Sequence, residues 1–342
     1  MRKVRVDEAV GLELGYDITK IVPKAEKYRA YRRGQIITAE DIPILKDMGK
    51  QYIYVFEPDD NLVHEDDAAV TVAQIVAGEG LSITEPSTGR VNIIADHEGL
   101  LKVNVELLDK LNYERDIVLA TLHNNRNVQK GQTVAGTRVV PIAVPRELID
   151  KIGQLTAEAL PMLTLKPLLP LKVAVVTTGS EVFSGRIKDG FLDVILQKIA
   201  PFKGELLGQT LVSDEHKSIT KEIDNFLEKG AEIVFVTGGM SVDADDVTPQ
   251  GIRDTGAEVV FYGAPILPGS QFMLAYKNGI PICGVPGGAL FSRKTTLDIL
   301  LPRLFANDRI KYSDIVAMGH GGLCEDCKVC HFPVCPYGKA TY

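Results

Sequence analysis

The stretch Ile233–Pro249, which reads IVFVTGGMSVDADDVTP, decides the fold of this chain. Its first four residues are all apolar, which is typical of a strand buried on both faces of a parallel sheet. The strand ends at Thr237-Gly238-Gly239, where the lack of bulky side chains lets a ligand approach the backbone. An acidic cluster follows, and Thr248 before Pro249 predicts the N-cap and first position of a helix. The stretch therefore predicts a strand, a glycine turn, an acidic loop and a helix, which is a common ligand-binding arrangement in α/β proteins.

Two other predicted strands end in glycine turns of the same kind. Residues 173–176 lead into Thr177-Thr178-Gly179-Ser180-Glu181, and residues 280–285 lead into Pro286-Gly287-Gly288. Predicted helices separate these strands, and this alternation indicates a doubly wound α/β domain with a mostly parallel sheet. Because the carboxyl ends of parallel strands share one edge of the sheet, we expect the three turns to line one pocket.

The residue types in these turns indicate a ligand that carries phosphate. Backbone amides and hydroxyl groups bind anions, and the candidate side chains are those of Thr178, Ser180, Thr237 and Ser241. Carboxylates suit a Mg²⁺ ion that accompanies the phosphate, and the candidates are Glu181, Asp245 and Asp246. Neither a GxGxxG nor a GxxxxGK[ST] pattern is present, which disfavours an ordinary dinucleotide site or a P-loop. An unrelated nucleotide-binding enzyme stays open as an alternative.

Composition and charge exclude several classes of protein. The chain has 342 residues and a net charge of −7, whereas a protein that coats nucleic acid needs clustered lysine and arginine. No apolar run is long enough to span a bilayer, and residues 1–8 lack the apolar region of a signal peptide. We therefore predict a cytoplasmic protein that binds neither nucleic acid nor membranes.

The length and the changes in composition along the chain predict several domains. Residues 1–62 are expected to form a small α/β unit, and residues 63–145 a β-rich domain that serves as a scaffold or dimer-forming region. Residues 146–170 read as a helix and a proline-rich linker. Residues 171–306 form the predicted α/β domain, and residues 307–342 are a cysteine-rich tail.

The three turns, in this order, resemble the molybdopterin-binding domain of molybdenum-cofactor biosynthesis proteins. That domain occurs in molybdopterin adenylyltransferases and molybdopterin molybdotransferases, and the resemblance covers residues 171–306. It implies a three-layer α/β/α domain that binds molybdopterin or its adenylate along the edge that carries the turns. It also implies Mg²⁺ in the transfer step and a homo-oligomer.

The resemblance implies roles for individual residues. Asp246 and Glu181 would hold Mg²⁺, and Asp214 would line the catalytic site. The implied contacts to the cofactor are made by Thr178, Gly179, Ser180, Asp189, Thr237, Gly238, Gly239, Ser241, Asp245, Pro268, Gly269, Pro286, Gly287 and Gly288.

Departures from the family pattern leave two functional hypotheses. Ser180 and Ala244 stand where many molybdotransferases carry Asp, and Gly288 stands where they carry Asn. One hypothesis is an enzyme of molybdenum- or tungsten-cofactor synthesis that performs adenylyl transfer from ATP or molybdate insertion. The other is a non-catalytic cofactor carrier or sensor that docks on a molybdo- or tungsto-enzyme through its cysteine-rich tail.

Four of the five cysteines lie in that tail. Cys324, Cys327, Cys330 and Cys335 are separated by two, two and four residues, and four thiolates this close together can surround one zinc ion or one [4Fe–4S] cluster. His331 is a possible substitute for one cysteine in a zinc site. The alternative is a disordered or disulfide-linked tail without metal. The fifth cysteine, Cys283, lies in an apolar strand, so the distribution does not predict a disulfide framework.

Overall fold

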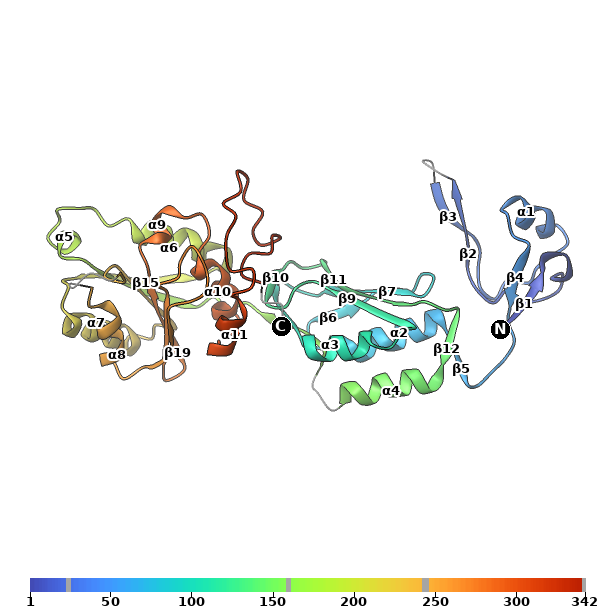
Figure 1. Ribbon diagram of the computed structural model, residues 1–342, viewed down its shortest axis with the longest axis horizontal. Coiled ribbons are helices and arrows are strands. Elements are labelled where there is room, and N and C mark those ends of the chain that lie inside the picture. The colour runs from blue at the N-terminus through green and yellow to red at the C-terminus, as the bar shows by residue number, and fades with distance from the viewer. Residues whose placement is uncertain (23–25, 158–160, 242–245, 340–342) are drawn as a thin grey trace. The chain divides into compact units, whose positions relative to one another are not determined.

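The computed structural model describes residues 1–22, 26–157, 161–241 and 246–339 (Figure 1). The chain divides into two compact units. The first contains residues 1–96, 103–122 and 131–164, and the second contains residues 97–102, 123–130 and 165–342. Among the described residues, none of the helices combines the length and the apolar character needed to cross a lipid bilayer.

The first unit begins with a small mixed region that has its own apolar core. Strands β1 (Arg2–Arg5) and β4 (Tyr52–Val55) pair antiparallel, as do β2 (Ile18–Val22) and β3 (Glu26–Tyr31). A short 3₁₀ helix, η1 (Val6–Glu8), follows β1, and α1 (Asp41–Asp47) precedes β4. The core residues include Leu14, Leu45 and Ile53, all of which are fully buried.

A β-rich region follows, as the sequence predicts. Its antiparallel sheet has the strand order β6-β7-β11-β9, with β6 at Leu81–Ile83, β7 at Arg90–Ala95, β9 at Ile117–Thr121 and β11 at Thr133–Val139. Helix α2 (Glu65–Val76) packs against β7 and β11. The remaining elements are β5 (Leu62–His64) paired with β12 (Ala143–Pro145), α3 (Val105–Asn112) and α4 (Arg146–Ala157).

The second unit is built on a six-stranded sheet with the order β15-β14-β16-β19-β18-β17. Its parallel strands are β14 (Lys172–Thr178), β15 (Glu205–Val212), β16 (Ile233–Thr237) and β19 (Ile280–Val285). Two further strands, β17 (Glu258–Tyr262) and β18 (Met273–Lys277), run antiparallel to their neighbours. The predicted α/β fold with a mostly parallel sheet is therefore confirmed.

Alternate residues of the central strands supply two separate cores, one on each face of the sheet. Phe235 packs with α6 (Phe191–Ile199), α10 (Thr296–Phe305) and α11 (Tyr312–Ala317), whereas Val234 and Val236 pack with α7 (His216–Glu228) and α8 (Thr248–Asp254). Figure 1 shows α7 and α8 on the opposite side of the sheet from α6. The second unit thus has the three α/β/α layers that the resemblance implies. The short helices α5 (Ser180–Phe183), η2 (Ala200–Phe202) and α9 (Gly288–Phe291) lie between these elements in the chain.

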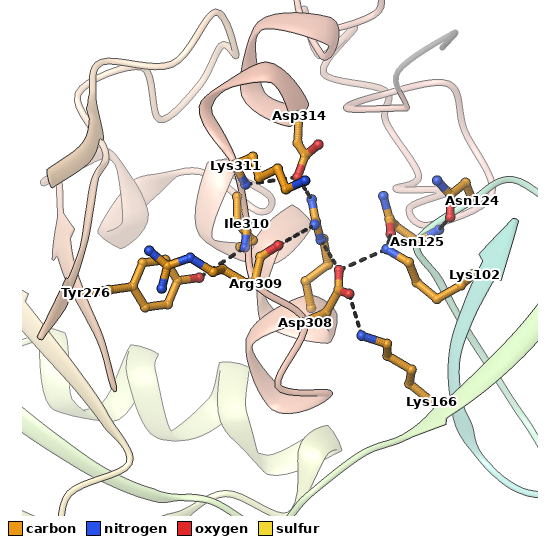
Figure 2. A network of polar contacts seen from close by, with 11 residues as sticks. Lys102, Asn124, Asn125, Lys166, Tyr276, Asp308, Arg309, Ile310, Lys311 and Asp314 are labelled. Carbon is orange, nitrogen blue, oxygen red and sulfur yellow. Dashed lines mark hydrogen bonds and ion pairs between the residues drawn. The ribbon is translucent and has the colours of Figure 1, made fainter. Parts of the chain in front are cut away.

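A buried carboxylate network lies within the second unit (Figure 2). Asp308 accepts hydrogen bonds from Lys102 at 2.9 Å and from Lys166 at 2.7 Å, and it also accepts one from the Arg303 Nε at 2.7 Å. Lys102 lies on β8 (Gly99–Val103), which pairs with β10 (Arg126–Val128), and Lys166 lies on β13 (Leu163–Pro167). Three cations therefore surround one carboxylate that is only 8% exposed.

Candidate functional site

The three glycine turns lie side by side at one edge of the sheet. In the strand register, Thr177 of β14 lies beside Thr237 of β16, and Thr237 lies beside Val285 of β19. The first glycine of each turn, at Gly179, Gly238 or Gly287, follows one or two positions later in the chain. The parallel strands therefore bring all three turns to the same carboxyl edge, as the strand pattern predicts.

A fourth loop, residues 263–272, reaches the same edge from the antiparallel side of the sheet. It enters β18, whose first residue, Met273, pairs with Gly284 near the end of β19. The Pro268-Gly269 turn lies in this loop, with Gly269 at φ +103°. The Gly269 carbonyl accepts a hydrogen bond from the Thr296 hydroxyl at 2.8 Å, which joins the turn to the start of α10.

The first two turns are in direct contact, and glycine is required there by packing. Gly238 has φ +86°, and a Cβ at this position would lie 2.3 Å from the carbonyl oxygen of Thr178. Gly239 has φ +54°, and a Cβ there would lie 2.8 Å from the Thr248 hydroxyl oxygen. The glycines of the second turn thus let it pack against the first turn and against α8.

Thr248 has a different local role from the predicted N-cap. The N-cap of α8 is Val247, and Thr248 is the first helical residue. Its fully buried hydroxyl donates to the Gly238 carbonyl at 2.9 Å and lies 3.2 Å from the Thr178 hydroxyl. The N-cap prediction was wrong because a tertiary acceptor on the second turn engages this hydroxyl.

The third turn has open space around it. A Cβ added at Gly287 or Gly288 would have no atom within 4 Å. Gly287 has φ −53°, so its backbone is also compatible with other residues. An asparagine in place of Gly288 would therefore find room here.

Two of the predicted acids make hydrogen bonds that shape the edge. Asp214 accepts from the Ser180 backbone N–H at 2.7 Å and from the Ser180 hydroxyl at 2.9 Å. Asp189 accepts from the backbone N–H groups of Phe191 and Leu192, and so caps the N-terminus of α6. Both carboxylates fix loops that follow β14 or β15.

Gln209 and Thr177 belong to the same network, although neither is among the predicted site residues. The Gln209 side-chain amide donates to Asp189 at 2.6 Å and to the Thr177 hydroxyl at 3.0 Å. The Thr237 hydroxyl donates to Thr177 at 3.1 Å inside the sheet, and Thr237 is fully buried. The sequence signal for Gln209 is a polar side chain in the middle of β15, and such side chains are too common in strands to identify a partner.

The remaining predicted residues differ in their access to solvent. Ser180, Glu181 and Ser241 are exposed, and Asp246 is partly buried. The Glu181 carboxylate lies beside the first turn, 3.6 Å from the position of a Cβ on Gly179. Asp245 and Ala244 lie outside the described residues.

The described part of the chain contains no group of three or more His, Cys, Asp or Glu residues arranged to hold a metal ion. Mg²⁺ commonly binds through one or two carboxylates together with the phosphates of a ligand. Glu181 beside the first turn and Asp246 after the second are compatible with this mode, which needs no cage made by the protein alone.

The four tail cysteines lie around a single cavity of about 530 Å³. All four are free thiols; Cys327 and Cys330 are exposed, and Cys324 and Cys335 are partly buried. Pro268 also lines this cavity, so the fourth loop of the edge forms part of its wall. Arg293 and Lys294, which the sequence analysis did not single out, line it as well.

Two family models match separate parts of the chain. Residues 3–57 match a family described as a domain of unknown function. Residues 174–306 match the probable molybdopterin binding domain, and this range contains the three turns, α10 and residues 174–178 of β14.

Curated relatives and solved structures are similar to part of the chain. A CinA-like protein of Mycobacterium tuberculosis is 29% identical over 90 residues, which are 26% of this chain and 21% of that protein. A CinA-like protein of Mycobacterium avium is 28% identical over 90 residues, which are again 26% of this chain and 21% of that protein. The chain thus spans about a fifth of the length of these curated relatives.

Two solved structures illustrate the structural likeness. The molybdopterin biosynthesis enzyme MoaB of Thermus thermophilus is 20% identical, with a TM-score of 0.35, covering 42% of this chain and 99% of that one. The tungsten cofactor synthesizing protein MoaB of Pyrococcus furiosus is 18% identical, with a TM-score of 0.32, covering 40% of this chain and 93% of that one. The likeness of the present chain to a known family therefore lies in residues 174–306, the range that matches the model of a probable molybdopterin binding domain.

Proposed function

We propose that the second unit binds molybdopterin or its adenylate at the edge formed by the three glycine turns, in a step of molybdenum- or tungsten-cofactor synthesis. The observation that carries this proposal is the register of β14, β16 and β19, which brings the turns together within the range that matches the family model. Ligands of α/β proteins bind at such an edge, where backbone N–H groups favour phosphate.

The proposed pocket has a packed side and an open side. Gly238 and Gly239 pack against the first turn and α8, so they fix the pocket wall. Gly287 and Gly288 have open space around them, so we place the ligand against the third turn. The exposed Ser241 hydroxyl, at the end of the second turn, is suited to donate a hydrogen bond to a phosphate oxygen, whereas the Ser180 hydroxyl already donates to Asp214.

In this proposal Glu181 and Asp246 hold a Mg²⁺ ion together with the phosphate of the ligand. The ion neutralises charge when two anionic reactants meet, and this is the main requirement of phosphoanhydride chemistry. The protein contributes by positioning: Asp214 orients Ser180, and Gln209 with Asp189 holds the loop before α6.

A non-catalytic carrier or sensor is the second candidate, and one observation favours it. Asp214 is engaged by two donors of Ser180, whereas an acid in the place of Ser180 would repel it. At these two positions the chain therefore has a serine and an aspartate, which supply one carboxylate where two acids would supply two. Fewer carboxylates at the edge suit binding better than a metal-dependent transfer.

The test is binding of purified molybdopterin to the full chain, measured by pterin fluorescence with and without Mg²⁺. We expect saturable binding that Asp246→Ala weakens only in the presence of Mg²⁺. Gly288→Asn, which fits into open space and restores the family side chain, should tighten binding. Absence of binding to both molybdopterin and its adenylate would overturn the proposal.

The same samples distinguish the two candidate functions. Incubation with ATP or molybdate followed by chromatography of the pterin reports turnover. Conversion that Asp246→Ala abolishes identifies an enzyme, whereas binding without conversion identifies the carrier.

A further inference from the structure

We propose that Cys324, Cys327, Cys330 and Cys335 form a four-thiolate metal centre, separate from the proposed pterin site. The ligand class is a soft thiophilic centre, either a zinc ion or an iron–sulfur cluster. The observation behind this proposal is that all four side chains, from a segment with spacings of two, two and four residues, line the same cavity of about 530 Å³.

Two of the thiols belong to the firmly packed part of the tail. Cys324 and Cys335 pack against the apolar core that contains α10 and α11. The Cys324 N–H donates to the Leu267 carbonyl at 2.9 Å. Close to Cys335, the buried Tyr337 donates its hydroxyl to the Pro268 carbonyl at 3.0 Å. These contacts hold the first and fourth cysteines at fixed points on the domain.

The other two thiols lie on the loop between these fixed points. Cys327 and Cys330 are exposed, and the described residues 319–339 contain no helix or strand. Val329 and Val334 on the same loop are 68% and 67% exposed. The loop therefore buries little apolar surface, and metal binding is a common source of order in such segments.

The described residues hold no preformed group with metal-binding geometry, here or elsewhere. The arrangement is thus that of an open site, in which the exposed thiols of Cys327 and Cys330 must move toward the packed thiols of Cys324 and Cys335. Such movement leaves the anchors intact, because the loop is attached mainly at its ends. The Arg293 guanidinium is the exception, since it donates to the backbone carbonyls of Cys327 and Lys328 at 3.1 and 2.9 Å and so holds the turn between the second and third cysteines.

Positive charge beside the cavity complements a thiolate centre. A metal ion or cluster bound by four thiolates carries net negative charge, and Arg293 and Lys294 both line the cavity. Lys294 also lies over the ring of Phe332, 5.4 Å from its centroid, and Phe332 is part of the wall. The acids Glu325 and Asp326 line the cavity too and add negative charge, so the basic pair is needed to balance the site.

The test is metal and sulfide analysis of the full chain, purified under anaerobic conditions. We expect about one centre per chain: either zinc in colourless protein, or iron with acid-labile sulfide and visible charge-transfer absorption. The Cys327→Ala and Cys330→Ala variants should each lower the metal affinity by about tenfold or more. Because both residues are exposed, their loss should leave the fold intact, which circular dichroism would verify.

Cys283→Ala is the matched control. This cysteine is fully buried in β19, outside the cavity, so its loss should leave the metal content unchanged. Two results would overturn the proposal: metal-free wild-type protein that fails to take up zinc or a reconstituted cluster, or a tail whose cysteines form disulfides under anaerobic conditions. Pterin binding is measured separately, so failure of the metal site and failure of the proposed function are distinguishable.

Discussion

Ser180 donates both its backbone N–H and its hydroxyl to the same carboxylate oxygen of Asp214, at 2.7 and 2.9 Å. The pair joins the first glycine turn to the loop before α7. It gives Asp214 a positioning role at the edge of the sheet, in addition to the site role that the sequence analysis predicted. Substitutions at the two residues can separate these roles.

Asp214→Ala should loosen the first turn. We expect the free energy of unfolding to fall by about 1 kcal/mol, because two hydrogen bonds to one carboxylate at the surface are lost. Ser180→Ala keeps the backbone donor and should cost roughly half as much. Hydrogen exchange at residues 179–183 is the measurement.

Asp214→Asn extends this test to function. The amide oxygen still accepts from Ser180, so a positioning role predicts molybdopterin affinity close to that of the wild type. An effect as large as that of Asp214→Ala, together with altered Mg²⁺ dependence, would instead identify Asp214 as a metal ligand.

Gly238 and Gly287 should respond differently to alanine. At Gly238 the new Cβ would lie 2.3 Å from the Thr178 carbonyl oxygen, at φ +86°, and we expect a loss of about 2–4 kcal/mol. At Gly287 the backbone is relaxed and the space is open, so the stability should stay within about 0.5 kcal/mol. Thermal unfolding compares the two, and equal losses would contradict the packing described for the second turn.

Asp308→Asn should destabilise the second unit by about 3 kcal/mol, because it leaves three cations without their carboxylate (Figure 2). Hydrogen exchange of α10 measures the loss. Glu258→Gln, which breaks the exposed ion pair with Arg309, is the control and should have little effect.

The same carboxylate predicts acid sensitivity. Burial raises the pKa of Asp308, but hydrogen bonds from Lys166 and Lys102 and the charge of Arg303 outweigh it and hold the pKa well below its usual range. A lowered pKa in the folded state means that this stabilisation is present above about pH 4 and is lost as the pH falls toward the folded-state value. The Asp308→Asn variant should therefore show a flatter decline of stability with acid than the wild type.

Glu65 predicts a pH effect of opposite sign in the first unit. Burial, assisted by the neighbouring Asp66, raises the pKa of Glu65 to about 7. The stability that the neutral Glu65 side chain contributes is fully present below the unfolded-state pKa. It is lost as the pH rises through about 7, because the carboxylate must then ionise in a buried place.

Glu65→Gln should consequently stabilise α2 by roughly 2 kcal/mol at about pH 8 and have little effect at about pH 5. Hydrogen exchange of residues 65–76 at the two pH values provides the measurement. Glu106→Gln on α3 is the control, since the hydrogen bond from Lys110 lowers the pKa of this exposed acid. A Glu65→Gln effect that is the same at both pH values would contradict the ionisation argument.

The sheet could be predicted from the sequence because its strands are apolar on both faces. The run at 233–236 alternates between two cores, so each residue of the run is buried and no helix period competes. The turns were predictable for the same reason, since each one directly follows such a run. The sequence carries no comparable signal for the antiparallel direction of β18 in the sheet. That direction depends on the path of the loop of residues 263–272, which joins β17 to β18.

The partners of the predicted site residues could not be read from the sequence. Asp214 meets Ser180 across 34 positions, and Asp189 meets Gln209 across 20. Thr248 looked like an N-cap because its local sequence fits one, but a carbonyl ten residues earlier accepts its hydroxyl. Local propensity identifies which residues can hydrogen-bond, and tertiary packing selects their partners.

The short segment from Ser292 to Lys294 follows α9 directly and, together with Phe291 at the end of that helix, lines the cysteine cavity. Helix α9 joins this segment to the open third turn, and the last two residues of the segment are the basic Arg293 and Lys294. If occupancy of one site moves this segment, thermodynamic linkage requires the effect to be mutual. A metal that raises the affinity for the pterin by some factor must itself be held more tightly, by the same factor, once the pterin is bound.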